Sequence, residues 1–165
     1  MMTELFPVVH TDLAEVEEFL TIADLTKTGL TDPSVLLWIG RDHEGGLAGL
    51  TGLEFDDRER PGAALIRSVA VAPNLRRSGL GRRLANHALG IAARAGARRA
   101  WCFSRRSGPF WTTLGFDRAD PMELARALPD TAQVRGFAES GQLATEQAWT
   151  RGLSDFCQVL GRPRP

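Results

Sequence analysis

The sequence predicts a mixed α/β fold in which a central, mostly antiparallel sheet carries helices on its faces. Apolar runs of strand length alternate with segments of helical periodicity, and three such runs follow one another without an intervening helix, as in an antiparallel meander. The chain has 165 residues, of which 43% are hydrophobic and 24% charged, a globular composition of one-domain size. We therefore expect one domain over residues 1–160 and a loose tail over 161–165.

The N-terminal segment is expected to form one strand and one helix. Leu5 to Val9 has the composition of a short strand. Apolar residues then recur at helical spacing over positions 13–23, with Thr11 or Asp12 available as the N-cap. Gly29 lies beyond the last of these positions, so the helix should end before it.

Three strands are expected next, over residues 35–39, 47–55 and 63–71. The polar segment 56–62 joins the last two as a turn, and Pro73 ends the third. A long helix over residues 80–95 should follow, closed by Gly96, and then a fifth strand over 98–104.

The remaining segments predict a short helix, a strand, a further helix and a closing strand. Ser107 and Pro109 form a plausible helix start, and residues 114–116 end this helix and begin a strand. Asp130 or Thr131 is expected to cap the next helix, which Gly141 stops. Residues 147–153 should form the last strand.

Composition restricts the classes of function. Twenty basic and twenty acidic side chains cancel, which argues against nucleic acid or an anionic membrane as a partner. No run approaches the length of a membrane span and Met1 to His10 lacks a signal-peptide pattern, so we expect a cytoplasmic protein. Two cysteines without a CxxC motif and three scattered histidines predict no metal site.

A glycine loop stands between the strand that Pro73 ends and the long helix. Its sequence is Arg76-Arg77-Ser78-Gly79-Leu80-Gly81-Arg82. Backbone amides at a helix N-terminus bind anions, the glycines allow close approach of a phosphate, and the arginines add charged donors. The alternative is a tight connection between strand and helix with solvated arginines.

The loop and its flanks resemble the GNAT acetyltransferase superfamily. Its pattern is a strand, an R/Q-x-x-G-x-G/A loop, a helix and a later F-Y-x-x-x-G-F motif, and here residues 65–73, 76–81 and 110–116 follow it. Trp111 stands at the tyrosine of the last motif. The resemblance implies an acetyl-CoA-dependent acetyltransferase whose sheet splays in a V between the fourth and fifth strands.

The resemblance also implies which residues bind acetyl-CoA. The backbone over Val69-Ala70-Val71 would hold the pantetheine arm. Arg76 and the amides of Arg77-Ser78-Gly79-Leu80-Gly81-Arg82 would hold the pyrophosphate, with Phe110 and Trp111 near the thioester. The runs Gly52-Leu53-Glu54 and Leu65-Ile66-Arg67-Ser68 are further similar to the branch that acetylates arsinothricin-type and other amino-acid-like compounds.

Several polar residues are candidates for the acceptor side of the reaction. Glu54 is the candidate general base, with an exposed strand-end carboxylate as the alternative. Arg67 interrupts an apolar strand, so it either binds a substrate carboxylate or belongs to a structural ion pair. Ser68 and Ser104 are small hydroxyls near strand ends that contact substrate or serve packing. Trp111 is assigned to substrate binding.

Proton delivery to the departing thiolate has few candidates, because the chain contains no tyrosine. Ser104 is one available donor, and Trp111 cannot supply a proton. Cys102 lies between aromatic residues and is expected to be a buried hydrophobe, so no covalent intermediate is predicted. His87 falls on the apolar stripe of the long helix and is expected to be structural.

Together these features predict an N-acetyltransferase that acts by direct attack of a small-molecule amine on acetyl-CoA, without a metal. The alternative is a catalytically silent acyl-CoA-binding or sensing domain. A further possibility is a homodimer in which residues 147–153 of the two copies pair across the interface.

Overall fold

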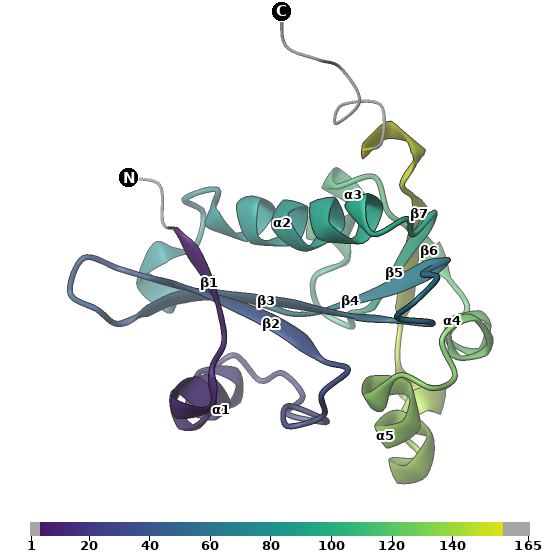
Figure 1. Ribbon diagram of the computed structural model, residues 1–165, viewed down its shortest axis with the longest axis horizontal. Helices are drawn as coiled ribbons and strands as arrows, with labels where there is room; N and C mark the ends of the chain where they lie inside the picture. Colours follow the sequence, from purple (N-terminus) through teal and green to yellow (C-terminus); the bar gives the residue numbers. More distant parts are fainter. Residues whose placement is uncertain (1–3, 157–165) are drawn as a thin grey trace, which may run out of the picture.

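The structure is a computed structural model that describes residues 4–156, and its architecture is an open seven-stranded sheet between two layers of helices (Figure 1). The strand order is β1-β2-β3-β4-β5-β7-β6. Every neighbouring pair is antiparallel except β4 and β5, which run parallel. The predicted mixed, mostly antiparallel sheet is confirmed.

The first half of the sheet is the predicted meander. Its strands are β1 (Leu5–Pro7), β2 (Leu36–Arg41), β3 (Leu47–Phe55) and β4 (Ala63–Val71). The bounds of β3 and β4 are those expected from sequence, whereas β1 is two residues shorter. A 3₁₀ turn (His10–Asp12) leads into α1 (Leu13–Ile22), and a second 3₁₀ turn (Pro73–Leu75) follows β4.

The second half contains α2 (Leu80–Arg94), β5 (Arg99–Phe103), α3 (Gly108–Thr113) and β6 (Asp117–Ala119), followed by α4 (Pro121–Ala127) and α5 (Ala132–Ser140). A 3₁₀ turn (Gln142–Thr145) then leads into β7 (Ala148–Gly152). The sequence analysis did not predict α4. Its start is nevertheless encoded locally, because the Asp120 side chain accepts a hydrogen bond from the Met122 amide and Pro121 occupies the first turn.

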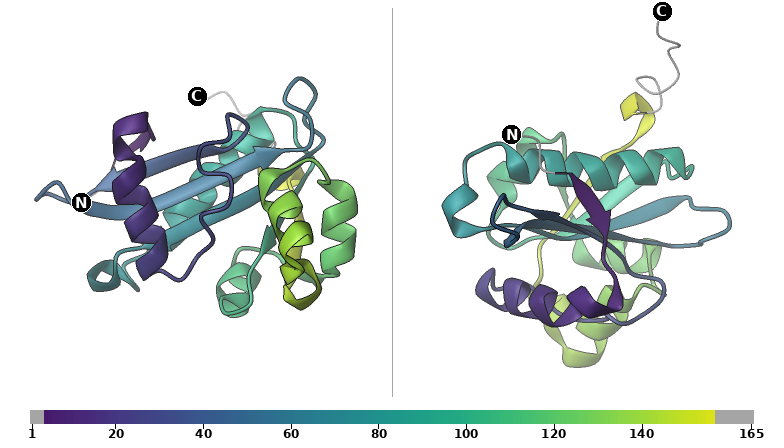
Figure 2. Two further views of the ribbon diagram at one scale, coloured as in Figure 1. Left: turned by 90° about the horizontal axis from the view of Figure 1, so that it is seen from below. Right: turned by 60° about the vertical axis from the view of Figure 1, so that its left-hand side comes forward.

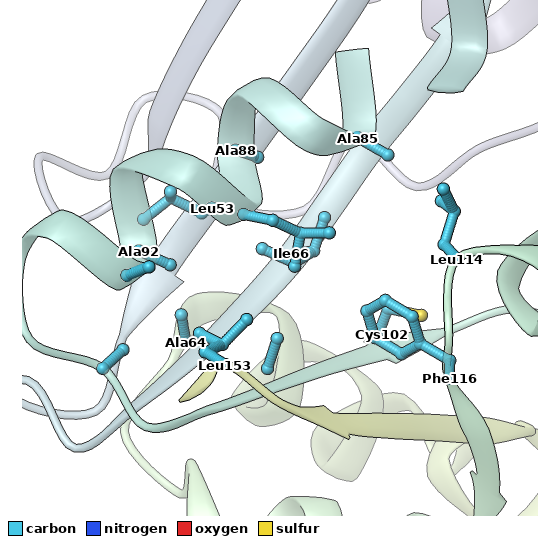
Figure 3. Close-up of a cluster of buried hydrophobic side chains, with 14 of the residues drawn as sticks. Leu53, Ala64, Ile66, Ala85, Ala88, Ala92, Cys102, Leu114, Phe116 and Leu153 are labelled. Atoms are coloured by element: carbon cyan, nitrogen blue, oxygen red, sulfur yellow. The ribbon is translucent and has the colours of Figure 1, made fainter. Parts of the chain in front are cut away.

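Two helices cover one face of the sheet and three cover the other. α2 and α3 lie on one side, and α1, α4 and α5 on the opposite side, as the views in Figures 1 and 2 agree. The core beneath α2 is built from small residues of the helix against larger residues of β3 and β4 (Figure 3). Ala85, Ala88 and Ala92 are fully buried there, so the helix packs close to the sheet.

The two halves of the sheet separate after a very short contact. β4 pairs with β5 only over Ala63–Leu65 against Arg99–Trp101, although β4 continues to Val71. The V-shaped opening predicted between the fourth and fifth strands is therefore present. No helix among the described residues is long and apolar enough to cross a membrane.

Candidate functional site

The opening between β4 and β5 exposes one backbone edge of β4. Ala72 donates its amide to the Ala48 carbonyl at 2.9 Å, and Ala70 lies opposite Leu50 in the antiparallel pairing with β3. Because backbone groups alternate in direction along a strand, the amides of Val69 and Val71 point to the side where β5 has separated. These are the two residues predicted to hold a pantetheine arm.

A β-bulge lies at the mouth of the opening. Ser68 and Val69 together oppose Thr51, since Gly52 pairs with Arg67 and Leu50 with Ala70. Ser68 has a φ of 59°, in the left-handed region that few non-glycine residues adopt. Its hydroxyl accepts a hydrogen bond from Arg67 Nε at 3.3 Å. The bulge turns the backbone of β4 where the sheet opens.

The glycine loop forms the N-terminus of α2, next to the same end of β4. Gly79 is the N-cap residue, with a φ of 84°, and a Cβ added to it would have no neighbour within 4 Å. At Gly81 an added Cβ would lie 3.5 Å from Val71 and from the Phe110 ring. Phe110, Gly81 and the end of β4 therefore lie against one another.

The start of α2 is closed by Ser78, whose hydroxyl accepts a hydrogen bond from the Leu80 amide at 3.4 Å. Ser78 donates its hydroxyl to the Leu75 carbonyl at 2.6 Å, which closes the turn before the helix. Arg76 and Arg77 are exposed, and Arg82 donates to the Thr113 carbonyl at 3.1 Å, joining α2 to α3. Exposed guanidinium groups beside a helix N-terminus are the kind of donors that a diphosphate requires.

Glu54 and Arg67 form a fully buried ion pair on the neighbouring strands β3 and β4. Arg67 Nη1 donates to Glu54 Oε2 at 2.9 Å, and neither side chain has exposed surface. Burial lowers the pKa of the Arg67 guanidinium, and the charge of Glu54 opposes this shift. Arg67 therefore belongs to a structural ion pair, which was one of its two predicted roles. The carboxylate of Glu54 is buried, so it is not the exposed strand-end group considered as an alternative.

This ion pair also fixes two segments that lie on the face of α1 and α5. The amides of Ala132 and Gln133 donate to Glu54 at 2.6 and 3.3 Å, so a carboxylate distant in sequence caps α5. Thr131 occupies the N-cap position, but its hydroxyl donates to the Leu128 carbonyl instead. Arg67 Nη2 donates to the Thr28 carbonyl at 2.6 Å and holds the connection between α1 and β2.

A pocket of about 150 Å³ lies between these two segments and the end of β5. Its walls come from the end of α1 and the following loop, from residues 103–107, from α5 and from the turn before β7. Polar and charged residues of this lining include Asp24, Ser104, Arg105, Arg106, Gln133 and Glu146. Of the predicted site residues, Ser104 alone lines this pocket.

The register of the sheet places this pocket at the mouth of the opening. Leu65 pairs with Trp101, so continuation of the parallel register sets Ser104 level with Ser68 across the gap. Ser104 accepts a hydrogen bond from the Ser107 amide at 3.1 Å, which leaves its own proton available to another acceptor.

Trp111 and Cys102, which were also singled out from sequence, are buried. Trp111 packs edge-on between Phe110 and Phe116 with 5% of its surface exposed, and it does not line the pocket. Cys102 is buried in the same core, and burial raises the pKa of its thiol, as expected of a buried hydrophobe. Among residues 4–156 no cluster of three or more metal-binding side chains occurs.

Comparison with known proteins agrees with this geometry. The model of the Acetyltransferase (GNAT) family matches residues 2–116, well over half of the chain. The protein belongs to this family. A comparison with curated proteins gives no match.

Solved GNAT structures show the same fold at low sequence identity. An acetyltransferase of the GNAT family from Staphylococcus aureus has a TM-score of 0.70 at 12% identity, over 93% of this chain and 100% of that one. N-acetylglutamate synthase from Neisseria gonorrhoeae, in complex with coenzyme A and N-acetyl-glutamate, has a TM-score of 0.67 at 18% identity. The match covers 93% of this chain but 36% of the synthase. An acetyltransferase from Streptococcus agalactiae has a TM-score of 0.64 at 15% identity, over 91% and 98% of the two chains.

The family assignment makes acyl transfer from an acyl-CoA the expected chemistry of this GNAT protein. Sequence reasoning found the loop and the open strand because both have local signatures. It did not identify Gln133 and Glu146, which line the pocket from α5 and from the turn before β7. The only signal was the capped start of α5, which places Gln133 in the first helical turn.

Proposed function

We propose that the protein is an acetyl-CoA-dependent N-acetyltransferase that acetylates the amine of a small, amino-acid-like molecule. The observation that carries the proposal is the gap beyond Leu65, where β4 runs on without β5 toward the glycine loop and where the pocket lies at the end of β5. A coenzyme on the loop would extend along Val69 and Val71, and the acceptor would approach from the pocket.

The residues present fit such a coenzyme. Gly79 leaves space above the loop, Arg76 and Arg77 supply charge, and Phe110 closes the far side. The amine nitrogen attacks the thioester carbon, a C–N bond forms, the C–S bond breaks and the thiolate departs. The amine loses a proton to solvent or to a nearby base, and we assign Ser104 as the donor of a hydrogen bond to the departing sulfur. A thiol titrates near 8.5, so proton capture at pH 7 is favourable by roughly 2 kcal/mol without a tyrosine.

We assign Glu54 and Arg67 to positioning rather than to proton transfer or carboxylate binding. Both side chains are fully buried, and each guanidinium nitrogen and each carboxylate oxygen has a hydrogen-bond partner on the protein. Ser68 is assigned to the bulge that bends β4, and Trp111 to the packing that holds Phe110 beside the loop.

A silent coenzyme-binding domain is the second candidate, favoured by Trp111 at the position of the family's tyrosine. The test is thiol release from acetyl-CoA with a panel of α-amino acids, the corresponding decarboxylated amines and peptide N-termini. We expect release that depends on the amine and mass-spectrometric detection of the acetylated product. Tight acetyl-CoA binding without amine-dependent release would establish the silent domain instead.

A further inference from the structure

The inner wall of the pocket includes one residue, Gln133, with a buried acceptor that has no donor among the described residues, and one buried carboxylate, Glu146. Gln133 is 6% exposed, and its Oε1 atom is buried without a partner among the described residues. Glu146 is 8% exposed and accepts from Gln142 Nε2 at 2.7 Å through Oε1. A buried acceptor without a donor destabilises a fold by about 1–3 kcal/mol, and because Gln133 lines the pocket, its amide oxygen is a candidate partner for a donor on a ligand.

The acceptor at Gln133 is held in place by the buried ion pair. The Gln133 amide donates to Glu54, and Arg67 holds the facing loop through the Thr28 carbonyl. That loop packs tightly on α5, since a Cβ added to Gly29 would lie 2.5 Å from Ala132 Cβ. Both walls of the pocket are therefore fixed to β3 and β4 before any ligand arrives.

The charges of the pocket are arranged by depth. Arg105 and Arg106 are half exposed or more, and they pair with Glu146 and Asp24 respectively. The side chain of Glu146 is only 5% exposed. The cationic groups thus lie at the rim, whereas the carboxylate and the unpaired amide oxygen lie inside, where a donor is favoured over an anion.

We propose that this pocket recognises a second nitrogen group on the acceptor, an ammonium, guanidinium or primary amide whose N–H groups donate to Gln133 Oε1 and to Glu146. The proposal rests on the proposed function, because the amine that reacts is a different one. The preferred acceptors are then small amino acids whose side chains end in nitrogen. Gln133 and Glu146 are specificity-determining residues that sequence reasoning does not reveal.

The test uses pairs of amino acids that differ in the terminal group. L-lysine is compared with L-norleucine, and L-glutamine with L-glutamate, by calorimetric titration of the protein saturated with coenzyme A and by kcat/KM with acetyl-CoA. We expect the nitrogen-bearing member of each pair to bind at least ten times more tightly. The Gln133→Leu variant should lose most of this preference while its Tm stays equal or rises, because the unpaired acceptor is gone.

Two further variants make the test specific. Gln147→Leu is the matched control, because Gln147 is half-buried outside the pocket, and it should keep the preference. Glu146→Gln should weaken lysine binding at least tenfold while changing glutamine binding less, because it removes a charge and keeps an acceptor.

The outcomes separate this inference from the proposed function. Equal binding within both pairs, or tighter binding of glutamate through the rim arginines, would overturn the inference even if amines are acetylated. If the protein prefers the nitrogen-bearing amino acids and Gln133→Leu abolishes this preference, the inference is supported even if no amine is acetylated. In that case only the proposed function is wrong.

Discussion

At the scale of single residues, the Glu54–Arg67 pair shows how two polar groups that look catalytic in a sequence can serve the scaffold. Both lie on strands, and both interrupt apolar runs. Their partners are a helix N-terminus 78 residues away and a loop carbonyl 39 residues away. No local pattern predicts such contacts, because they depend on how α5 and the loop after α1 pack against the sheet.

We expect Glu54→Gln to lower stability more than it changes the chemical step. The substitution leaves a buried guanidinium without its counter-charge, which typically costs about 3–5 kcal/mol, or roughly 6–20 °C in Tm for a chain of this size. Thermal unfolding of Glu54→Gln, Arg67→Met and the double variant Glu54→Leu/Arg67→Met measures the effect.

The double variant is the informative control. If the two residues act as one pair, its loss will be clearly smaller than the sum of the two single losses. A fully stable Glu54→Gln protein whose turnover falls 100-fold or more would return Glu54 to the role of general base.

At the scale of elements, the sequence predicted what local chemistry determines. Apolar runs of strand length bounded by turn residues predicted β3 and β4 with the bounds found, and the glycine loop predicted the start of α2. α4 was missed, although Asp120 and Pro121 mark its start, because the helix has seven residues and a weak periodic pattern. The pocket could not be predicted, since four separate segments build it.

The loop assignment can be tested with an asparagine substitution. Gly79 and Gly141 both have positive φ, at 84° and 77°, and both have no neighbour within 4 Å of an added Cβ. Asparagine tolerates this conformation better than other side chains, so the fold should survive at either position. Gly79→Asn places a side chain where the diphosphate would lie, and calorimetric titration should show at least a tenfold loss of acetyl-CoA affinity.

Gly141→Asn serves as the matched control, because it imposes the same backbone requirement at the end of α5, away from the loop. It should bind acetyl-CoA with unchanged affinity. If the two variants bind acetyl-CoA with equal affinity, the assignment of the diphosphate site to this loop is wrong.

At the scale of the whole molecule, few groups titrate in the alkaline range. The chain has one lysine and no tyrosine, and the Cys102 thiol is buried with a raised pKa. Above the usual thiol pKa of about 9.0, the unfolded chain releases this proton and the folded chain keeps it. The contribution of Cys102 to the free energy of unfolding is therefore fully present below about pH 9.0, and it decreases as the pH rises above that value.

We expect this loss to approach about 1.4 kcal/mol per pH unit, which corresponds to roughly 3–5 °C in Tm for a chain of this size. Thermal unfolding at intervals from pH 8 to 10.5 measures the slope. Cys102→Ala should start from a lower Tm, because it leaves a small cavity, but should fall less steeply with pH. Parallel slopes in the two proteins would show that another group carries the alkaline loss.

The insertion of β7 between β5 and β6 has a consequence for how the protein is made. A ribosome delivers β5 and β6 well before residues 148–152, yet within residues 4–156 the only partner of β6 is β7, and β5 otherwise pairs with β4 over three residues. Until β7 has been synthesised, both strands therefore have edges with unpaired backbone N–H and C=O groups. Unpaired edges of this kind associate with other chains. The nascent polypeptide reaches its protected form only when translation has passed Gly152.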